Sequence, residues 1–207
     1  MISKIIHQIW VGPKKMPIDA MKTWQEKNPN FKYILWDEKA LESFGLKNKK
    51  TYDAFMKTGT YCGAVDVARV EIVEKYGGVY IDSDGECLET IDDAPFMKKD
   101  FFAVYDHKVP WHPGRINNGV IGSIPGHPIL KDYIEGIGVA KRIYPPWKTI
   151  GGRLLTKCVN KYQNKEKIEI LPAYTFWPKN HDGTEVQPEG KVYSRHFWGT
   201  SLGLYED

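Results

Sequence analysis

The chain has 207 residues, with 29 Lys and Arg against 26 Asp and Glu, so its formal net charge is +3. This small charge argues against a nucleic-acid binder, and the length fits one domain, residues 1–207, with a sizeable core. Hydrophobic residues make up 42% of the chain and charged residues 27%, which excludes a disordered protein. Aromatic residues reach 13%, and composition alone leaves open whether they pack in the core or stack on a ligand.

The first ten residues include Lys4 and His7 and lack the apolar stretch of a signal peptide. No apolar run approaches the roughly 20 residues that cross a bilayer. The three cysteines, Cys62, Cys87 and Cys158, are widely spaced and indicate neither a disulfide framework nor a zinc site. We therefore expect a cytoplasmic protein without a transmembrane segment, with at most a peripheral contact to a membrane surface.

The chain begins with a pattern typical of an α/β fold. Residues 2–11 are apolar and rich in β-branched side chains, and a Gly-Pro pair follows them, which predicts a buried strand that ends in a turn. Pro17 opens a predicted helix through Gln25, and residues 31–36 form a second strand. Strand, helix and strand in this order predict parallel pairing from the start of the chain.

The middle of the chain carries the clearest local signal. Residues 61–76 place apolar side chains at helical spacing, a Gly-Gly pair ends the helix, and residues 79–81 form a short strand. The helix covers about 15 Å after Asp66, and the strand covers about 10 to 13 Å. If the two glycines fold the strand back along the helix, the aspartates that follow the strand lie near Asp66 and Arg69.

After residue 100 the predicted elements alternate less regularly. We expect strands at residues 101–105, 120–122, 168–171 and 191–197, and helices at residues 128–137 and 152–162. The expected fold is therefore α/β, with a Rossmann-like, mostly parallel central sheet flanked by helices and a less regular C-terminal half.

Asp82 and Asp84 follow directly after the strand at residues 79–81. Alternate residues at a strand end point the same way, and this edge is where open α/β sheets bind ligands. Two carboxylates suit Mg²⁺ or Mn²⁺ and leave positions for phosphate oxygens. The alternatives are a solvated loop for the aspartates and a surface ion pair for Asp66 and Arg69, although the latter two lie in a largely apolar stretch.

Together these segments resemble glycosyltransferase family 32, whose members carry a DXD sugar-binding motif. The motifs are Ile5-Ile6-His7-Gln8-Ile9-Trp10, Asp66-Val67-Ala68-Arg69, and the run from Tyr76 to Asp84. The family includes fungal α-mannosyltransferases and bacterial capsule enzymes, and its core resembles that of clostridial glucosylating toxins. The resemblance implies a GT-A fold and retaining, Mn²⁺- or Mg²⁺-dependent transfer of a hexose from a UDP-sugar or GDP-mannose to a hydroxyl of a glycan or glycolipid.

The resemblance also implies roles for individual residues. The catalytic set is Asp82, Asp84, Asp66 and Arg69, in which Asp84 is the main metal ligand and Asp82 contributes to the same metal site. Asp66 and Arg69 would hold the donor sugar. Trp10 would lie against the nucleotide base, and Gln8 and Asp82 would also contact the donor.

Further expectations concern the second half of the chain. The resemblance places His196 at the metal, and Ser201 and Asn118 at the donor, although Asn118 could equally be a turn residue before Gly119. Leu202 stands where the family usually has Trp, so Trp198 is expected to supply the aromatic ring instead. Trp111 and Trp147, each near prolines, are candidate acceptor platforms.

The mechanism and two rival functions complete the interpretation. No nucleophilic carboxylate can be chosen from the sequence, so we favour front-face attack, in which the leaving diphosphate helps to deprotonate the acceptor. An Asp-x-Asp phosphohydrolase is one alternative, although its motif normally follows the first strand. A non-catalytic carbohydrate-binding protein on the same fold is the other.

Overall fold

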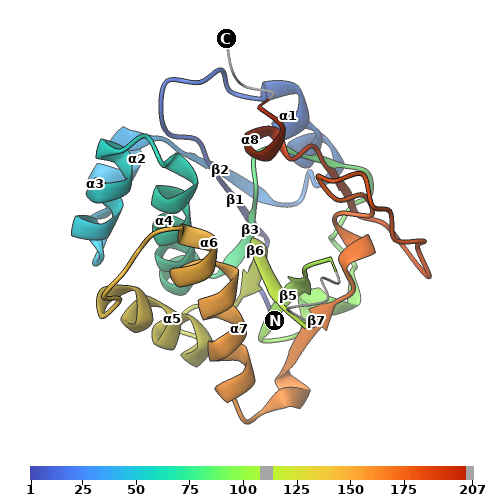
Figure 1. The fold of residues 1–207 in the computed structure, drawn as a ribbon. Coiled ribbons are helices and arrows are strands. Elements are labelled where there is room, and N and C mark those ends of the chain that lie inside the picture. Colours follow the sequence, from blue (N-terminus) through green and yellow to red (C-terminus); the bar gives the residue numbers. More distant parts are fainter. Residues whose placement is uncertain (108–113, 204–207) are drawn as a thin grey trace.

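The computed structural model describes residues 1–107 and 114–203, without the side chains of residues 200 and 201. A six-stranded sheet of order β2-β1-β3-β6-β5-β7 forms its centre (Figure 1). The strands are β1 (Ile5–Ile9), β2 (Lys32–Trp36), β3 (Gly78–Ile81), β5 (Phe101–Tyr105), β6 (Ile116–Ser123) and β7 (Ile168–Leu171). Only β6 runs against its neighbours β3 and β5. The predicted mostly parallel sheet is confirmed, and the predicted strand at residues 120–122 is its antiparallel member.

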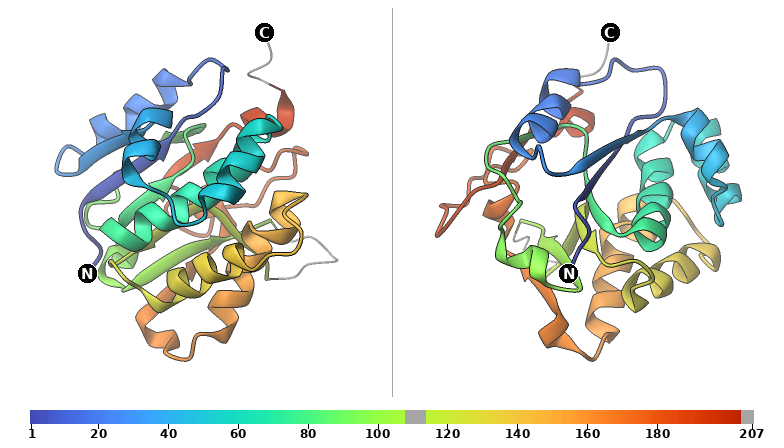
Figure 2. Two further views of the ribbon diagram at one scale, coloured as in Figure 1. Left: turned by 90° about the vertical axis from the view of Figure 1, so that its left-hand side faces the viewer. Right: turned by 180° about the vertical axis from the view of Figure 1, so that it is seen from behind.

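Helices cover one face of this sheet, as Figure 2 shows from two further sides. They are α2 (Glu38–Phe44), α3 (Lys49–Lys57), α4 (Tyr61–Tyr76), α5 (Pro128–Gly138), α6 (Pro146–Thr149) and α7 (Gly152–Lys161). The other face packs against α1 (Ile18–Lys27), a two-stranded sheet of β4 (Gly85–Cys87) and β8 (Ser194–His196), and the C-terminal segment with α8 (Gly199–Leu202). Short 3-10 helices lie at Pro95–Lys98, Lys165–Lys167 and Ala173–Thr175. Among the described residues, no helix is both long and apolar enough to span a membrane.

The sheet is buried on both faces, which produces two hydrophobic clusters. On β3, Tyr80 packs with the helices, whereas Val79 and Ile81 pack with α1 and the C-terminal segment. The same alternation on β5 sends Phe101 to the helical side and Phe102 to the other. Because side chains alternate along a strand, a sheet covered on both faces reads as a continuous apolar run.

The connection from α4 to β3 positions the functional edge of the sheet. Gly77 and Gly78 have φ angles of +66° and +89°, a region that side chains other than glycine rarely occupy. A Cβ atom on Gly78 would lie 2.6 Å from the carbonyl oxygen of Ile5, so β1 also approaches too closely for any side chain. The two glycines therefore fold β3 back beside α4, as the sequence predicts.

Two regions differ from the sequence expectations. The helices α2 and α3 were not predicted, although Asp37 caps α2 by accepting a hydrogen bond from the Ala40 amide, and Gly45 ends it at a φ of +74°. The strand expected at residues 191–197 shrinks to the three residues of β8. This strand pairs with β4 and lies outside the central sheet.

Candidate active site

A cavity of about 460 Å³ lies at the carboxyl ends of β1 and β3, the edge at which open α/β sheets bind ligands. Its size is ordinary for a small-molecule site. The segment after β1, the start of α4, the loop after β3 and the region of β8 form its walls. Polar and aromatic side chains that line it include Trp10, Lys14, Tyr61, Arg69, Tyr80, Asp82, Ser83, Asp84, His196 and Trp198.

Arg69 occupies the centre of a buried polar network at one end of this cavity. One guanidinium nitrogen, Nη2, lies 3.1 Å from Asp66 Oδ1, and the other, Nη1, lies 3.1 Å from Asp82 Oδ1. The guanidinium also donates to the Asn118 carbonyl oxygen at 2.7 Å and lies over the Tyr80 ring. Asp66 and Arg69 are 6% and 5% exposed, so the interpretation as a surface ion pair is wrong. The structure confirms the predicted convergence for Asp66, Arg69 and Asp82, whereas the fourth member, Asp84, pairs with His196 instead.

The two carboxylates beside Arg69 respond differently to this environment. Burial raises the pKa of Asp66 to about 6, and the Arg69 charge offsets this only in part. Burial acts in the same direction on Asp82, but Arg69, His196 and the Tyr80 hydroxyl outweigh it and hold the pKa of Asp82 below its ordinary value. Asp82 therefore remains ionised where it faces the cavity.

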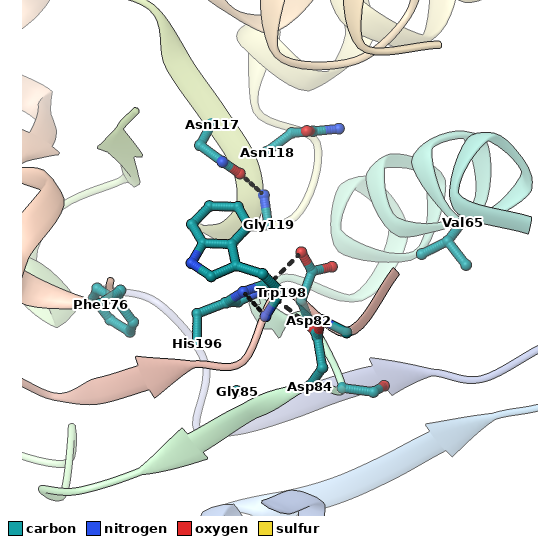
Figure 3. A network of polar contacts seen from close by, with 12 residues as sticks. Val65, Asp82, Asp84, Gly85, Asn117, Asn118, Gly119, Phe176, His196 and Trp198 are labelled. Carbon is teal, nitrogen blue, oxygen red and sulfur yellow. Dashed lines mark hydrogen bonds and ion pairs between the residues drawn. The ribbon is translucent and has the colours of Figure 1, made fainter. Parts of the chain in front are cut away.

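Strand β6 supports this network from the opposite side. Asn118 donates from Nδ2 to Asp66 Oδ1 at 2.7 Å. Its side chain thus contacts Asp66, and Asn118 is not among the described residues that line the cavity. Gly119 follows, and a Cβ atom there would lie 2.4 Å from Asp82 Oδ2. The Asn117 side chain accepts the Gly119 amide hydrogen at 2.7 Å (Figure 3). Only glycine at position 119 leaves room for the Asp82 carboxylate.

Asp84 faces His196 (Figure 3). His196 Nε2 lies 3.0 Å from Asp84 Oδ1 and 3.7 Å from Asp82 Oδ2. One possible ligand atom from each of these three residues lies within 4.8 Å of the others. Two carboxylates and an imidazole make a donor set that suits Mn²⁺ and accommodates Mg²⁺, so the residues fit the predicted divalent cation.

Main-chain contacts between β4 and β8 hold Asp84 and His196 together. Gly85 pairs with His196 across the two-stranded sheet, and the Phe197 amide donates to the Asp84 carbonyl oxygen at 2.9 Å. The Gly199 amide donates to Asp84 Oδ2 at 2.8 Å. These contacts fix one carboxylate oxygen of Asp84 to the backbone and leave the other turned toward the imidazole.

Trp198 lies beside His196. Its ring centroid is 4.4 Å from that of His196, and its backbone amide donates to His196 Nδ1 at 3.1 Å. Its φ angle is +56°, which is unusual for a bulky residue and is common at functional sites. The indole nitrogen donates to the Lys179 carbonyl oxygen at 2.8 Å, so the ring has a defined place at the cavity wall.

Two residues assigned to the donor lie at different depths. Trp10 follows β1 directly, lines the cavity, and donates from its indole nitrogen to the Lys14 carbonyl oxygen at 2.9 Å. Gln8 is fully buried inside β1, where it accepts from the Tyr33 hydroxyl and donates to the Asp82 carbonyl oxygen at 3.3 Å. The structure thus corrects the expectation for Gln8, which supports the backbone of Asp82 from below the cavity.

Of the remaining residues discussed from the sequence, two have side chains that the structure does not describe and two lie on the surface. Ser201 belongs to α8, and its side chain lies outside the described residues; Leu202 is 52% exposed and does not line the cavity. Trp111 also lies outside the described residues, whereas Trp147 is 47% exposed on α6. Tyr80 was not predicted, although its hydroxyl donates to Asp82 Oδ1 at 2.7 Å. Its position two residues before an Asp at a strand end was the available signal.

Comparisons with known proteins agree with this geometry. A family model described as the glycosyltransferase sugar-binding region containing the DXD motif matches residues 15–102. An uncharacterized glycosyltransferase of Acanthamoeba polyphaga mimivirus is 35% identical over 141 residues, which cover 65% of this chain and 54% of that protein. A mannosyl phosphorylinositol ceramide synthase of Saccharomyces cerevisiae is 31% identical over 216 residues, 98% of this chain and 51% of the relative. The chain thus spans about half the length of these curated relatives.

Solved structures share the fold. The PaToxG glycosyltransferase aligns with a TM-score of 0.64 and 19% identity over 77% of this chain and 69% of that one. The ligand-free glycosyltransferase domain of the YGT toxin aligns with a TM-score of 0.55 and 10% identity over 82% of this chain and 80% of that one. At these identities the likeness speaks for the fold, which is GT-A as expected. The sequence matches therefore assign residues 15–102 of this chain to the glycosyltransferase sugar-binding region that contains the DXD motif.

Proposed function

We propose that the chain transfers a hexose from a nucleotide sugar to a hydroxyl group of a glycan or glycolipid, with retention of anomeric configuration and with Mn²⁺ or Mg²⁺ bound. Mannose is the first sugar to test, because several relatives are named mannosyltransferases; the human relative named for N-acetylglucosamine is 24% identical. UDP-sugars and GDP-mannose are both candidate donors.

One observation carries this proposal: Arg69, Asp82, Asp84 and His196 surround one cavity of suitable size. The cavity presents a metal-ligand set at one end and a guanidinium with carboxylates at the other. A nucleotide sugar carries a diphosphate next to a ring rich in hydroxyl groups. The two ends of the cavity match these two parts of the donor.

The chain's own residues then have distinct tasks. Asp82, Asp84 and His196 would hold the cation, which stabilises the negative charge that develops on the departing nucleoside diphosphate. Arg69 keeps Asp82 ionised and oriented, and Asp66 lies directly behind Arg69 as its second carboxylate partner. Trp10 at the cavity wall offers an indole face for the base. In front-face attack the leaving phosphate oxygen takes the proton of the acceptor hydroxyl, so no protein nucleophile is required.

The rival functions predict different products. A phosphohydrolase would release inorganic phosphate from an aryl phosphate, and a carbohydrate-binding protein would bind a donor without consuming it. The Asp-x-Asp motif follows β3, the third strand in chain order, and the family match and GT-A fold both favour transfer over phosphate hydrolysis.

The test is a screen of nucleotide sugars with Mn²⁺ by thermal shift, followed by chromatography of the nucleoside diphosphate released from each stabilising donor. A ligand at 100 times its dissociation constant adds about 2.7 kcal/mol of stability, so a true donor gives a clear shift. We expect release of diphosphate to fall about 10²-fold or more in Asp84→Asn and to persist in Asp93→Asn, an exposed carboxylate beyond β4. Equal turnover by the two variants, or release of phosphate from an aryl phosphate, would contradict the proposal.

A further inference from the structure

A second hollow, of about 570 Å³, lies beside the cavity described above, which we call the donor cavity, and none of the residues given a task in the proposed function lines it. It is formed by Arg115, which directly precedes β6, and by α6 and α7. Its described lining consists of Arg115, Trp147, Lys148, Thr149, Arg153, Leu154, Thr156, Lys157 and Asn160. We call it the basic hollow, because four of these side chains are cationic and none is acidic.

The positive charge of the basic hollow is concentrated and largely uncompensated. Arg115 pairs with Asp106, but within the described ranges no carboxylate forms an ion pair with Lys148, Arg153 or Lys157. Residues 136–164 contain six Lys and Arg and no Asp or Glu, although the whole chain is only slightly basic. Arg153 and Lys157 are one turn apart on α7, where like charges repel and destabilise a helix. A concave surface of one charge sign attracts and concentrates ligands of the opposite sign.

Trp147 contacts two of the cationic side chains that line the basic hollow. The Lys148 ammonium lies 4.8 Å from the centre of the indole ring, and the Arg115 guanidinium lies 5.5 Å from it. Both distances are within the range of cation–π attraction. The exposed indole therefore orders two cations that come from different elements, while Thr149 and Asn160 add neutral hydrogen-bonding groups to the lining.

The basic hollow also adjoins the end of the donor cavity at which Arg69 and Asp66 lie. Gly151, between α6 and α7, separates them: a Cβ atom on it would lie 2.9 Å from Asp66 Oδ2 and 3.1 Å from the Trp147 backbone. Gly152 packs against the carbonyl oxygen of Ile116, the residue after Arg115. The backbone at Gly151 therefore lies between a molecule bound in the basic hollow and the Asp66 carboxylate, which pairs with Arg69.

We infer that the basic hollow is the acceptor subsite and that it takes an acceptor bearing a phosphate group, held by Lys148, Arg153 and Lys157. The inference that the ligand is the acceptor rests on the proposed function, whereas the binding of a phosphate ester at this place does not depend on it. The phosphate belongs either to a soluble phosphorylated sugar or polyol or to a lipid headgroup. Recognition by several unpaired cations is the same in both cases.

Binding is measured without donor or metal, so that failure of transfer activity and failure of this inference stay distinguishable. Inorganic phosphate and glycerol 3-phosphate are titrated into ¹⁵N-labelled protein, and the indole signal of Trp147, assigned with Trp147→Phe, is followed together with the amides of residues 148–160. We expect saturable shifts at these positions. Affinity should fall roughly tenfold in Arg153→Gln/Lys157→Gln. The matched control, Lys22→Gln/Lys27→Gln, removes two exposed lysines from α1 on the other face and should bind as the unaltered protein does.

Vesicles distinguish the two sources of phosphate. Cosedimentation with phosphatidylcholine vesicles is compared with and without phosphatidylinositol. Binding that requires phosphatidylinositol and is lost in Arg153→Gln/Lys157→Gln assigns a lipid headgroup, whereas binding of the free esters alone assigns a soluble acceptor. Absence of shifts near Trp147, equal weakening in both double variants, or vesicle binding without any binding of the free esters would overturn the inference.

Discussion

Two groups of side chains meet at Asp82, and they are built in opposite ways. The Arg69 group, consisting of Asp66, Arg69, Tyr80 and Asn118, is buried among α4, β3 and β6 and contains its own cation. The His196 group, consisting of Asp84, His196 and Trp198, rests on the small β4–β8 sheet and is held mainly by backbone amides. Asp82 directs Oδ1 to the first group and Oδ2 to the second. The comparison indicates that the motif is divided: Arg69 compensates one side of Asp82, and the other side belongs to the three-residue cluster that could hold a metal ion.

The strongest way to break this comparison is to remove the cation of the Arg69 group. In Arg69→Met, the buried side chains of Asp66 and Asp82 would lose the guanidinium that pairs with both of them, which costs about 3–5 kcal/mol of unfolding free energy. We expect transfer to fall about 10³-fold, because Asp82 then loses its charge and its orientation. Urea unfolding and diphosphate release measure the two effects.

The matched control is Arg195→Met, because Arg195 forms an exposed ion pair with Glu86 on the β4–β8 sheet. Exposed ion pairs contribute only about 0–1 kcal/mol. Similar unfolding free energies for the two variants would show that the Arg69 group is not a buried charge network in solution.

The next largest effect is expected from the His196 group, and it should fall on the ion. His196→Gln removes one of the three clustered ligand atoms, so we expect the affinity for Mn²⁺ to weaken about 10–100-fold. The unfolding free energy should change by only about 1 kcal/mol, since the lost hydrogen bonds are few. Titration calorimetry with Mn²⁺ measures the affinity.

His181→Gln is the control, because His181 is an exposed loop residue that also lies beside Trp198. Unchanged Mn²⁺ affinity in His196→Gln would remove the histidine from the metal site and leave the two aspartates alone. A large loss of stability without a loss of affinity would make the His196 group structural, like its neighbour.

The same comparison explains how much of the site the sequence could predict. The Arg69 group comes mostly from one local unit of helix, glycine pair and strand, so rise per residue suffices to bring Asp66, Arg69 and Asp82 together. The His196 group depends on pairing between β4, which follows Asp84, and β8, in which Arg195 lies 109 residues after its partner Glu86. A three-residue strand carries no periodic signal, so only the family resemblance pointed to His196.

Gln8 is a residue of the family motif for which the sequence predicted the wrong environment: we expected its side chain to contact the donor, but the side chain is buried. A polar residue on a strand normally suggests a solvent-facing side. Here both faces of the sheet are covered, so Gln8 is buried and its polar atoms bond to Tyr33 and to the Asp82 backbone. Which polar side chains reach the cavity is decided by packing from distant parts of the chain.

An effect on stability rather than on transfer concerns pH and the turn that supports the Arg69 group. His7 lies on β1 with Nε2 2.9 Å from the Gly77 carbonyl oxygen, and burial lowers its pKa to about 4. Between the ordinary pKa of about 6.5 and this value, the unfolded chain binds a proton that the folded chain does not. Stability should therefore decrease as the pH falls through this range, by about 3 kcal/mol in total.

Unfolding free energies measured from pH 7 to pH 4.5 check this prediction, because His7→Gln should flatten the pH dependence and His181→Gln should leave it unchanged. The difference between the original chain and His7→Gln isolates the histidine from carboxylates that titrate nearby. If the unfolding free energies of the original chain and of His7→Gln changed with pH in parallel, His7 would not be held neutral in the folded protein. The α4–β3 turn would then be less buried in solution than in the structure.

The smallest effect should come from Leu202 on α8, four residues after Trp198, where the family resemblance places a tryptophan. Leu202 ends α8 and is 52% exposed, so Leu202→Trp should change the unfolding free energy by no more than about 0.5 kcal/mol. If the ring reaches a bound nucleotide, a stacking contact of about 0.5–1.5 kcal/mol should lower the KM for the donor severalfold with kcat unchanged. Leu202→Met, which keeps the side chain flexible and aliphatic, is the control. An unchanged KM in Leu202→Trp would mean that Trp198, already packed on His196, occupies the aromatic position of this site alone.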